Sequence, residues 1–600
     1  RDVALTLSAS LARDVGLLEH SPPSGRPEGT IRHGPLLKPP RHCTIGGKGA
    51  ELKGGEKEPF STIRINETMS LCAHIGKYFA RGSTLAGLDR KAVTDIDWAK
   101  AAKNISVDVR TDFILAPHFD IVYRDKANEL TQQLSAKLSS GTYEPALPIT
   151  ISVPKQGILT RPGSILWPQD RLLYQGLVED ILPSIEAEMD RTRSFSHIPS
   201  KEEGKLFKPS FEGWTEFQAR VEEICRRSAY VLQCDVANYF ETLPQHNLIN
   251  ALEGCGCRAE TVRLLERMLS SFRQKSSQGI IQGIFPSDVL GNFFLSDFDA
   301  QCSLLTLPSA RYVDDFYIGF NSELEARKFL NELIEKMRKI GLILNPTKTK
   351  IVPSADLLFE QKEVDSLFDE ARKEIGEAKD LLEAGAYGFQ GDWINSDDIQ
   401  LALEEGLNEE LLAVRALLDY HSESAELLEK VDRFCLPYLR AIGDDYGVER
   451  AFDGLLARPH LTRHYFSYLN HFARVVPEVR RRIENLITEN GFHLDYQRMY
   501  HMAGVMSCDT VEGPTVQHVL RWFEDRRIGN PTRAIAAIFV AKFGTARERR
   551  VIRAAYDEEP PYVQSAILYA SQFFIAAEKS TMKAAWKGHS DLNALIASAI

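Results

Sequence analysis

The pattern of apolar and polar residues changes along the chain, and the changes predict how it is organised. Residues 1–68 are rich in Gly, Pro and short charged runs and have no hydrophobic period, which predicts a disordered leader. The first methionine, Met69, is expected to mark the native start. Residues 69–148 have a mixed helical pattern and predict an N-terminal helical extension. Residues 149–356 combine extended apolar runs with helical ones and predict an α/β domain.

The last part of the chain is almost purely helical in pattern, with apolar residues at three- and four-residue spacing and breaks at Gly or Pro. Residues 357–420 are expected to form a helical thumb substitute or connector. Residues 421–600 are expected to form a helical-repeat domain of HEAT type, with an irregular helical bundle as the alternative. Four of the expected helices start at a proline, which the first turn of a helix tolerates. The expected helices are Glu426–Leu439, Pro477–Ile487, Pro514–Phe523, Pro531–Lys542, Arg547–Tyr556 and Pro561–Phe574.

Aspartates stand at the ends of two extended apolar segments. A strand expected over Tyr230–Cys234 leads directly to Asp235. The segment Arg311–Ile318 predicts a hairpin whose turn holds Asp314 and Asp315, adjacent carboxylates whose repulsion a divalent cation would offset. Nucleotidyl transfer through two Mg²⁺ ions about 3.5–4 Å apart requires carboxylates from separate strands. The aspartates therefore predict a phosphoryl-transfer site, although a helix N-cap and a solvated turn are the simpler alternatives.

Further motifs, in a fixed order around these aspartates, make the region resemble reverse transcriptases. Gln282–Leu295, followed by Asp299, resembles the family's Gln-Gly, Ser and Leu-x-Asn motif on a helix that faces the nascent base pair. Gly341–Lys350 resembles the segment whose lysine lies near the incoming triphosphate. The upstream segments that resemble the fingers motifs are Arg161-Pro162, Asp170-Arg171 and Ser194-Phe195-Ser196. The resemblance implies a right-hand palm and fingers over residues 149–356.

The same resemblance implies roles for individual residues. Asp235 and Asp314 would be the principal metal ligands and Asp315 a weaker one, in a site that also includes Val236. The implied cofactor is Mg²⁺, with Mn²⁺ as a substitute. Phe240 would lie beneath the incoming sugar and exclude a 2′-hydroxyl, which favours deoxynucleotides; the alternative is an ordinary core phenylalanine.

The remaining nucleotide-binding residues follow from the same motifs. Gln282 and Gly283 would line the nucleotide pocket, while Lys348 and Arg161 would offset phosphate charge. Two departures from the family pattern are visible. Pro286 comes one residue later than the proline that usually follows Gln-Gly, and no Leu-Gly primer-grip motif follows Val352.

A polymerase core joined to a long helical C-terminus resembles the abortive-infection and defence-associated bacterial reverse transcriptases. That resemblance implies DNA synthesis from dNTPs in antiphage defence, by untemplated or protein-primed synthesis. The partners implied are a single-stranded DNA product, an RNA template, a covalent protein–DNA link and further copies of the chain. Two alternatives remain open: an intron- or retron-like RNA-templated enzyme, and a catalytically silent helical scaffold that acts as a sensor.

Composition limits where nucleic acid would bind. The net charge of −11 requires a local basic channel, because phosphate neutralisation supplies most of the affinity for nucleic acid. The clusters Arg480–Arg482 and Arg547–Arg550 are candidates, although solvated helix faces are the commoner use. Arg458 and His464 have a spacing found in some ribonucleases. The absence of a long apolar run and nine irregularly spaced cysteines predict a cytoplasmic protein without membrane contact.

Overall fold

A computed structural model describes residues 89–202, 205–274, 276–358, 425–489 and 494–600, together with 411, 414–415 and 417–419. All of these residues fall within one structural unit, Leu71–Ile600. The leader expected over residues 1–68 lies outside the described residues. So does most of the connector expected over residues 357–420.

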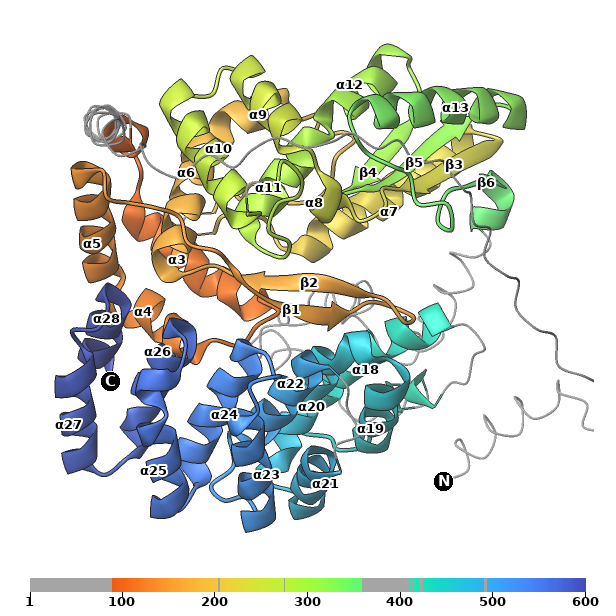
Figure 1. The fold of residues 1–600 in the computed structure, drawn as a ribbon. Coiled ribbons are helices and arrows are strands. Elements are labelled where there is room, and N and C mark those ends of the chain that lie inside the picture. The colour runs from red at the N-terminus through yellow and green to blue at the C-terminus, as the bar shows by residue number, and fades with distance from the viewer. Residues whose placement is uncertain are drawn as a thin grey trace, which may run out of the picture. The chain divides into compact units, whose positions relative to one another are not determined.

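An antiparallel sheet of four strands forms the palm, in the order β4-β5-β3-β6 (Figure 1). Its strands are β3 (Tyr230–Asp235), β4 (Ser309–Tyr312), β5 (Asp315–Phe320) and β6 (Lys350–Pro353). Both expected strands of the aspartate segments are therefore present, and β3 and β5 pair at the centre of the sheet. Val231 and Leu232 alternate between the two faces of β3 and are both fully buried, so both faces of the sheet are covered.

Helices on opposite faces of the sheet provide that cover. On one face, Phe316 packs on Phe298 of α12 (Ser296–Leu304), with ring centroids 4.5 Å apart. The next residue along β5, Tyr317, points the other way and packs on Phe217 of α7 (Ser210–Arg227) at 5.5 Å. The helix α13 (Glu323–Lys339) joins the first face, where its Phe329 contacts Phe320. This alternation of aromatic contacts fixes the register of β5 and therefore the position of its first residue.

The fingers consist of a two-stranded hairpin and helices around one buried helix. The hairpin pairs β1 (Ile149–Pro154) with β2 (Thr160–Ile165). The central helix α6 (Pro168–Glu188) is buried along most of its length and packs on α3, α5, α10 and α11. The other helices of this region are α3 (Trp98–Asp108), α4 (Pro117–Asp125), α5 (Ala127–Ser140), α8 (Tyr239–Thr242), α9 (Gln245–Gly254), α10 (Ala259–Phe272) and α11 (Phe285–Phe294).

The C-terminal region is helical, as the apolar spacing predicts. Its helices are α18 (Ala425–Ile442), α19 (Val448–Ala457), α20 (Thr462–Ala473), α21 (Pro477–Thr488), α22 (Asp495–Val505), α23 (Gly513–Glu524), α24 (Asn530–Phe543), α25 (Ala546–Ala554), α26 (Pro561–Ala570), α27 (Ala576–Trp586) and α28 (Asp591–Ala599). The expected ends at Tyr556 and Phe574 are wrong. Short 3₁₀ segments, Tyr556–Glu558 and Ser571–Phe573, follow α25 and α26 there.

The helical region shares its core with the fingers. Tyr562 of α26 packs edge-on against Phe119 of α4, with ring centroids 5.4 Å apart. The Leu115 backbone N–H donates to the Met499 sulfur of α22 at 3.4 Å. Helices α22 and α24 also contact strand β1. Within the described part of the chain, no helix is both long enough and apolar enough to cross a membrane.

Candidate active site

The pairing of β3 with β5 brings the sequence-predicted aspartates together. Asp235 ends β3 and lies opposite Asp315, the first residue of β5. The hairpin between β4 and β5 turns at Val313 and Asp314, because Tyr312 pairs with Asp315. The prediction that the turn holds both Asp314 and Asp315 is therefore half wrong: only Asp314 is in the turn. The antiparallel register delivers the three carboxylates from adjacent strands to one edge of the sheet.

The proximity of these carboxylates changes their acidity. Burial, followed by the charges of Asp315 and Asp235, raises the pKa of Asp314 to about 8. Burial also raises the pKa of Asp315 to about 6, while Lys348 opposes the shift. Each shift disfavours the charged form, so a cation at this edge of the sheet would be strongly favoured.

The donor set suits a divalent cation with a preference for oxygen ligands, such as Mg²⁺. Across the residues that the structure describes, no three His, Cys, Asp or Glu side chains form a metal-binding group. Val236 has no side-chain donor and is buried, so only its carbonyl is available as a ligand.

The segment that contains Lys348 pairs with the end of β3. The Asn345 backbone N–H donates to the Asp235 carbonyl at 2.7 Å, and Val236 forms a bridge with Leu344. The Asp235 carboxylate accepts a hydrogen bond from Asn345 Nδ2 at 2.8 Å and ion-pairs with Lys348 Nζ at 3.1 Å. Sequence reasoning selected Lys348 and missed Asn345, whose place directly before Pro346 in the same motif was the available signal.

Phe240 lies on α8, close in the chain to Asp235, and is largely buried. Its ring packs on Gly291 of α11, where an added Cβ would lie 2.8 Å from the ring. The Tyr239 hydroxyl donates to the Gly291 carbonyl at 2.6 Å. Phe240 thus holds α11 against α8, a packing role that accompanies any contact with a sugar.

Phe113 joins two of the predicted nucleotide-binding residues. The Arg161 guanidinium on β2 lies 4.6 Å from the centroid of the Phe113 ring. The ring also lies against Gly283, where φ is +82° and an added Cβ would be 2.8 Å from Phe113. Glycine is required at that position by both conformation and space. Gln282, next to it, is partly exposed. Phe113 itself carries no recognisable motif and was missed.

Arg161 retains unused hydrogen-bonding capacity. Its Nε is buried and has no hydrogen-bond partner within the described residues. Burial lowers the pKa of the Arg161 guanidinium, so an anion bound beside it would be strongly attracted. Arg171, the other arginine of the fingers motifs, is different because it is fully buried and pairs with Asp108 at 2.5 Å and Asp112 at 3.2 Å.

Comparison with known proteins identifies this region. Residues 153–367 match the family model described as reverse transcriptase (RNA-dependent DNA polymerase). The chain contains a reverse transcriptase domain. Structures of telomerase from Candida albicans and Candida tropicalis, each with a fragment of telomeric RNA, are 12% and 13% identical, with TM-scores of 0.28 and 0.29. These matches cover 57% and 63% of this chain.

The chain spans just under two thirds of the telomerase chains, 66% and 65% respectively. The search of curated proteins gave no match. The matched residues include the palm strands and the β2 strand that carries Arg161.

A buried polar network lies beneath the β4–β5 turn, which carries Asp314. Val313, which precedes Asp314, has φ of +56°, an unfavourable conformation for a β-branched residue. Its backbone N–H donates to Ser196 Oγ at 3.1 Å. Its carbonyl accepts from Arg311 Nη1 at 2.9 Å. Both polar groups of the strained residue are therefore held by buried side chains.

Arg311 is in turn held by Asn292 of α11 and Asp299 of α12. Its Nε donates to both carboxylate oxygens of Asp299, at 3.0 and 2.9 Å, and its Nη1 donates to Asn292 Oδ1 at 2.7 Å. Asn292 Nδ2 donates to the Ser196 carbonyl at 2.9 Å, which closes the network. The motif residues Ser196, Asn292 and Asp299 thus support the turn that presents Asp314, although no pattern in the sequence indicates this shared purpose.

The tip of the β1–β2 hairpin supplies a further cation that sequence reasoning missed. Lys155 Nζ donates to Asn238 Oδ1 at 2.7 Å and lies 3.8 Å from Glu241 Oε1. Asn238 caps α8, only three residues after Asp235. Lys155 therefore connects the fingers hairpin to the palm beside the aspartates.

Arg458 and His464, whose spacing resembles that of some ribonucleases, each contact Asp432 in the helical region. Arg458 pairs with Asp432 at 2.7 Å and donates to the Tyr465 hydroxyl at 2.7 Å. His464 Nε2 hydrogen-bonds the Asp432 carbonyl at 2.8 Å. These contacts explain both residues as parts of helix packing. The Arg480–Arg482 cluster is similarly ion-paired to nearby glutamates, as expected of a solvated helix face.

Proposed function

We propose that the chain is a metal-dependent DNA polymerase of reverse-transcriptase type. The observation that carries the proposal is the convergence of Asp235, Asp314 and Asp315 from two paired strands inside the matched domain. Carboxylates at the edge of an antiparallel sheet are suited to phosphoryl transfer, in which positioning and charge stabilisation supply the catalysis.

The side chains around the aspartates suit a nucleoside triphosphate. Mg²⁺, for which Mn²⁺ would substitute, would be held by Asp235 and Asp314, with Asp315 and the Val236 carbonyl nearby, and would offset the charge of the phosphates. Lys348 is ion-paired with Asp235, and Lys348 and Arg161 would offset the charge of the phosphates. Phe240 would contact the sugar, and Gln282 and Gly283 would line the base-pair pocket. A 3′-hydroxyl or a protein hydroxyl would attack the α-phosphate in line.

The biological setting is also part of the proposal. The resemblance to defence-associated bacterial enzymes favours a cytoplasmic role in antiphage defence, with a single-stranded DNA product. Protein priming, a covalent protein–DNA link and homo-oligomers follow from the same resemblance. The C-terminal helices would form a HEAT-type array, for which the succession α20 to α26 is the support. An RNA-templated enzyme of intron or retron type is the alternative, and a dedicated RNA that copurifies with the chain would favour it.

Nucleotide incorporation by the purified chain tests the polymerase. Labelled dNTPs and NTPs are supplied with Mg²⁺, Mn²⁺ or EDTA, with and without RNA and DNA templates, and products are resolved before and after protease. The wild type is expected to incorporate dNTPs and the Asp235→Asn variant to incorporate none. Asp297→Asn, which removes an exposed carboxylate of the same domain, is the matched control and should retain activity.

Each result of that experiment has a defined meaning. A product whose mobility changes after proteolysis supports protein priming. A product that requires added RNA supports the templated alternative. Equal inactivity of wild type and Asp235→Asn with every template would contradict the polymerase and favour a silent scaffold.

Replacement of Phe240 tests sugar selection. Phe240→Ala is expected to lower the preference for dNTPs over NTPs by about tenfold or more, because the smaller side chain leaves room for a 2′-hydroxyl. Competition between dNTPs and NTPs in one reaction measures this ratio. Because the ring also packs on Gly291, Phe240→Leu serves as a less disruptive variant. A variant that loses thermal stability but keeps its dNTP preference would show that the ring has only a packing role.

A further inference from the structure

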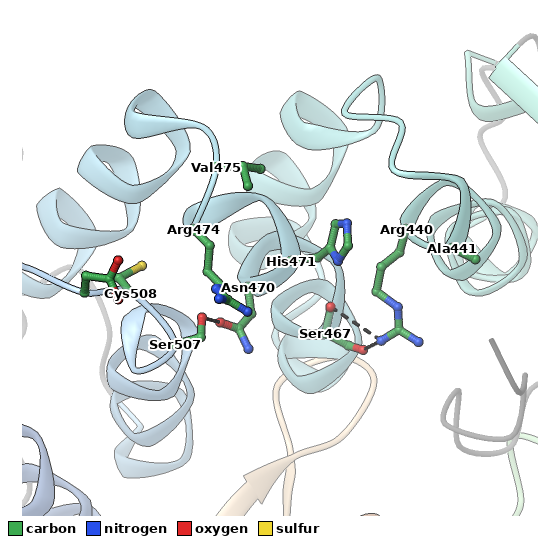
Figure 2. Close-up of a pocket in the computed structure, with 10 residues that line it drawn as sticks. Arg440, Ala441, Ser467, Asn470, His471, Arg474, Val475, Ser507 and Cys508 are labelled. Carbon is green, nitrogen blue, oxygen red and sulfur yellow. Dashed lines mark hydrogen bonds between the residues drawn. The ribbon is translucent and has the colours of Figure 1, made fainter.

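A pocket of about 680 Å³ lies in the C-terminal helical region, outside the reverse transcriptase domain (Figure 2). It is bounded by α18, α20 and the residues that follow α22. Its volume is in the range of small-molecule sites. The polar side chains that line it are Arg440, Ser467, Asn470, His471, Arg474, Ser507 and Asp509.

Helical periodicity places these residues on one face. Ser467, His471 and Arg474 follow one another at intervals of four and three residues, so they share a face of α20. The opposite face of α20 is apolar and buried, with Phe466 packed on His501 of α22 at 5.0 Å. α20 therefore turns its polar face to the pocket because its apolar face is occupied.

The two arginines of the pocket have no acidic partner among the residues that the structure describes. Arg440 donates to Ser467 Oγ, and Ser507 Oγ donates to Asn470 Oδ1 at 2.6 Å (Figure 2). Neither Arg440 nor Arg474 forms an ion pair with any of the described residues, and Asp509 is the one acidic residue among the described residues of the lining. Arg415, at the start of the same helical region, is by contrast paired with Asp444 at 2.5 Å. In a chain of net charge −11, this local excess of positive charge is unusual.

Both guanidiniums lie close enough to act on the same histidine. His471 is placed between Arg440 and Arg474 in Figure 2. Burial, and then the charges of Arg440 and Arg474, lower the pKa of His471. The pocket therefore contains two fixed positive charges and a largely neutral imidazole at neutral pH.

The positive charges continue along α18 towards the fingers. Arg433 stands seven residues before Arg440, on the same face of α18. The charge of Arg433 also contributes to the lowered pKa of the Arg161 guanidinium. Glu429 partly neutralises Arg433 at 2.8 Å.

We propose that this pocket binds a phosphate group, and that its source is the nucleic-acid strand copied or made by the reverse transcriptase domain. Arg440 and Arg474 would contact the phosphate oxygens, and Asn470 and Ser507 would provide further hydrogen bonds. Guanidinium groups suit phosphate because they donate several hydrogen bonds in one plane. The strand as source rests on the proposed polymerase function, whereas phosphate binding at the pocket does not.

Strand binding by the full chain tests the inference. Fluorescence anisotropy of labelled oligo(dT) is measured in EDTA at several salt concentrations, so that neither catalysis nor metal-dependent nucleotide binding contributes. Arg440→Gln/Arg474→Gln is expected to raise Kd about tenfold and to reduce the salt slope by about 0.7 for each phosphate that the variant no longer neutralises. Arg474→Gln alone, which breaks no ion pair among the described residues, is expected to show part of the effect.

Two controls separate charge from structure. Ser467→Ala removes the hydrogen-bond partner of Arg440 but keeps both positive charges, and should weaken binding less than the double variant does. Arg521→Gln removes an exposed arginine of α23 and should bind normally. Unchanged strand and dTTP binding in a folded double variant would overturn the proposal. Binding of dTTP is measured separately, by competition with pyrophosphate. If the double variant loses dTTP binding but keeps strand binding, the phosphate site stands and the strand as its source is rejected. Because no step requires incorporation, an inactive polymerase would not affect either outcome.

Discussion

Replacing Asp314 by Asn is expected to reduce dNTP incorporation by about a thousandfold or more while the fold is retained. Asp314 lies in the turn between β4 and β5, near enough to Asp315 and Asp235 for their charges to add to the rise in its pKa. Asparagine keeps the shape but cannot offset the charge of a divalent cation. Incorporation rates measured under saturating dNTP and Mg²⁺ test this expectation. The same substitution at the exposed Asp297 should leave the rate unchanged, and a variant Asp314→Asn with normal activity would remove Asp314 from the proposed site.

The same variant is expected to be more stable than wild type in EDTA, increasingly so as the pH rises. The pKa of Asp314 is raised from 3.8 to about 8. Below about pH 4 the Asp314 carboxyl is protonated in both the folded and the unfolded chain, so its raised pKa does not lower the stability of the wild type. Between about pH 4 and 8 the unfolded chain releases a proton that the folded chain retains, and the stability of the wild type falls. Asparagine does not titrate.

Thermal unfolding in EDTA at several pH values measures this difference. The midpoint of Asp314→Asn should exceed that of wild type by about 2–4 °C near neutral pH. The difference should shrink towards pH 4. Saturating Mg²⁺ should also reduce it, because the cation stabilises only the chain with three carboxylates. A pH-independent difference would show that Asp314 has an ordinary acidity.

The second large effect is expected from Arg311→Met, which removes the buried support of the turn that carries Asp314. Arg311 is fully buried and joins Asp299, Asn292 and the Val313 carbonyl. Its loss leaves the Asp299 carboxylate buried without a countercharge, which costs about 3–5 kcal/mol of stability. The loss of Arg311 also leaves the carbonyl of the strained residue Val313 without its hydrogen-bond donor. The incorporation rate is expected to fall about a hundredfold, a loss in kcat with little change in the KM for dNTPs.

A double variant separates the two consequences of that change. Arg311→Met/Asp299→Leu replaces the buried ion pair by apolar side chains, which is often neutral for stability. Its thermal stability is expected to recover, whereas its kcat should remain low because the Val313 carbonyl still lacks a donor. Ser196→Ala, which removes only the acceptor of the Val313 N–H, should give a smaller loss. Recovery of kcat together with stability in the double variant would show that Arg311 acts on the fold alone.

Some residues of the site could be predicted from the sequence and others could not. The aspartates were recognisable because phosphoryl transfer restricts the residue types, and because strands and turns have local signatures. The strand that leads to Asp235 and the helix that begins at Pro477 match β3 and α21 closely. In both segments the apolar spacing determines the element over a few neighbouring residues, and in α21 the proline also marks the first turn. The reverse transcriptase domain was likewise predicted correctly from the order of its motifs.

The helix ends near Tyr556 and Phe574 were less predictable. Both helices continue for three residues as a tighter 3₁₀ turn. The apolar pattern there remains compatible with either geometry, since the two differ by less than one residue per turn. The prediction for the turn at Val313-Asp314 failed for a similar reason. The strand register places Asp315 within β5, and two adjacent carboxylates in a sequence do not reveal that register.

The sequence by itself indicated which carboxylates are candidates for a metal site, which segments form the palm strands, and that the C-terminal region is helical. The tertiary structure decided what surrounds and supports them. Phe113 meets Arg161 and Gly283, Lys155 meets Asn238, and Ser196 meets Val313. Each of these contacts joins residues that are far apart in the chain and carry no shared pattern. Local spacing is set by the geometry of a single helix or strand, whereas these contacts depend on how separate elements pack, which a single sequence does not display.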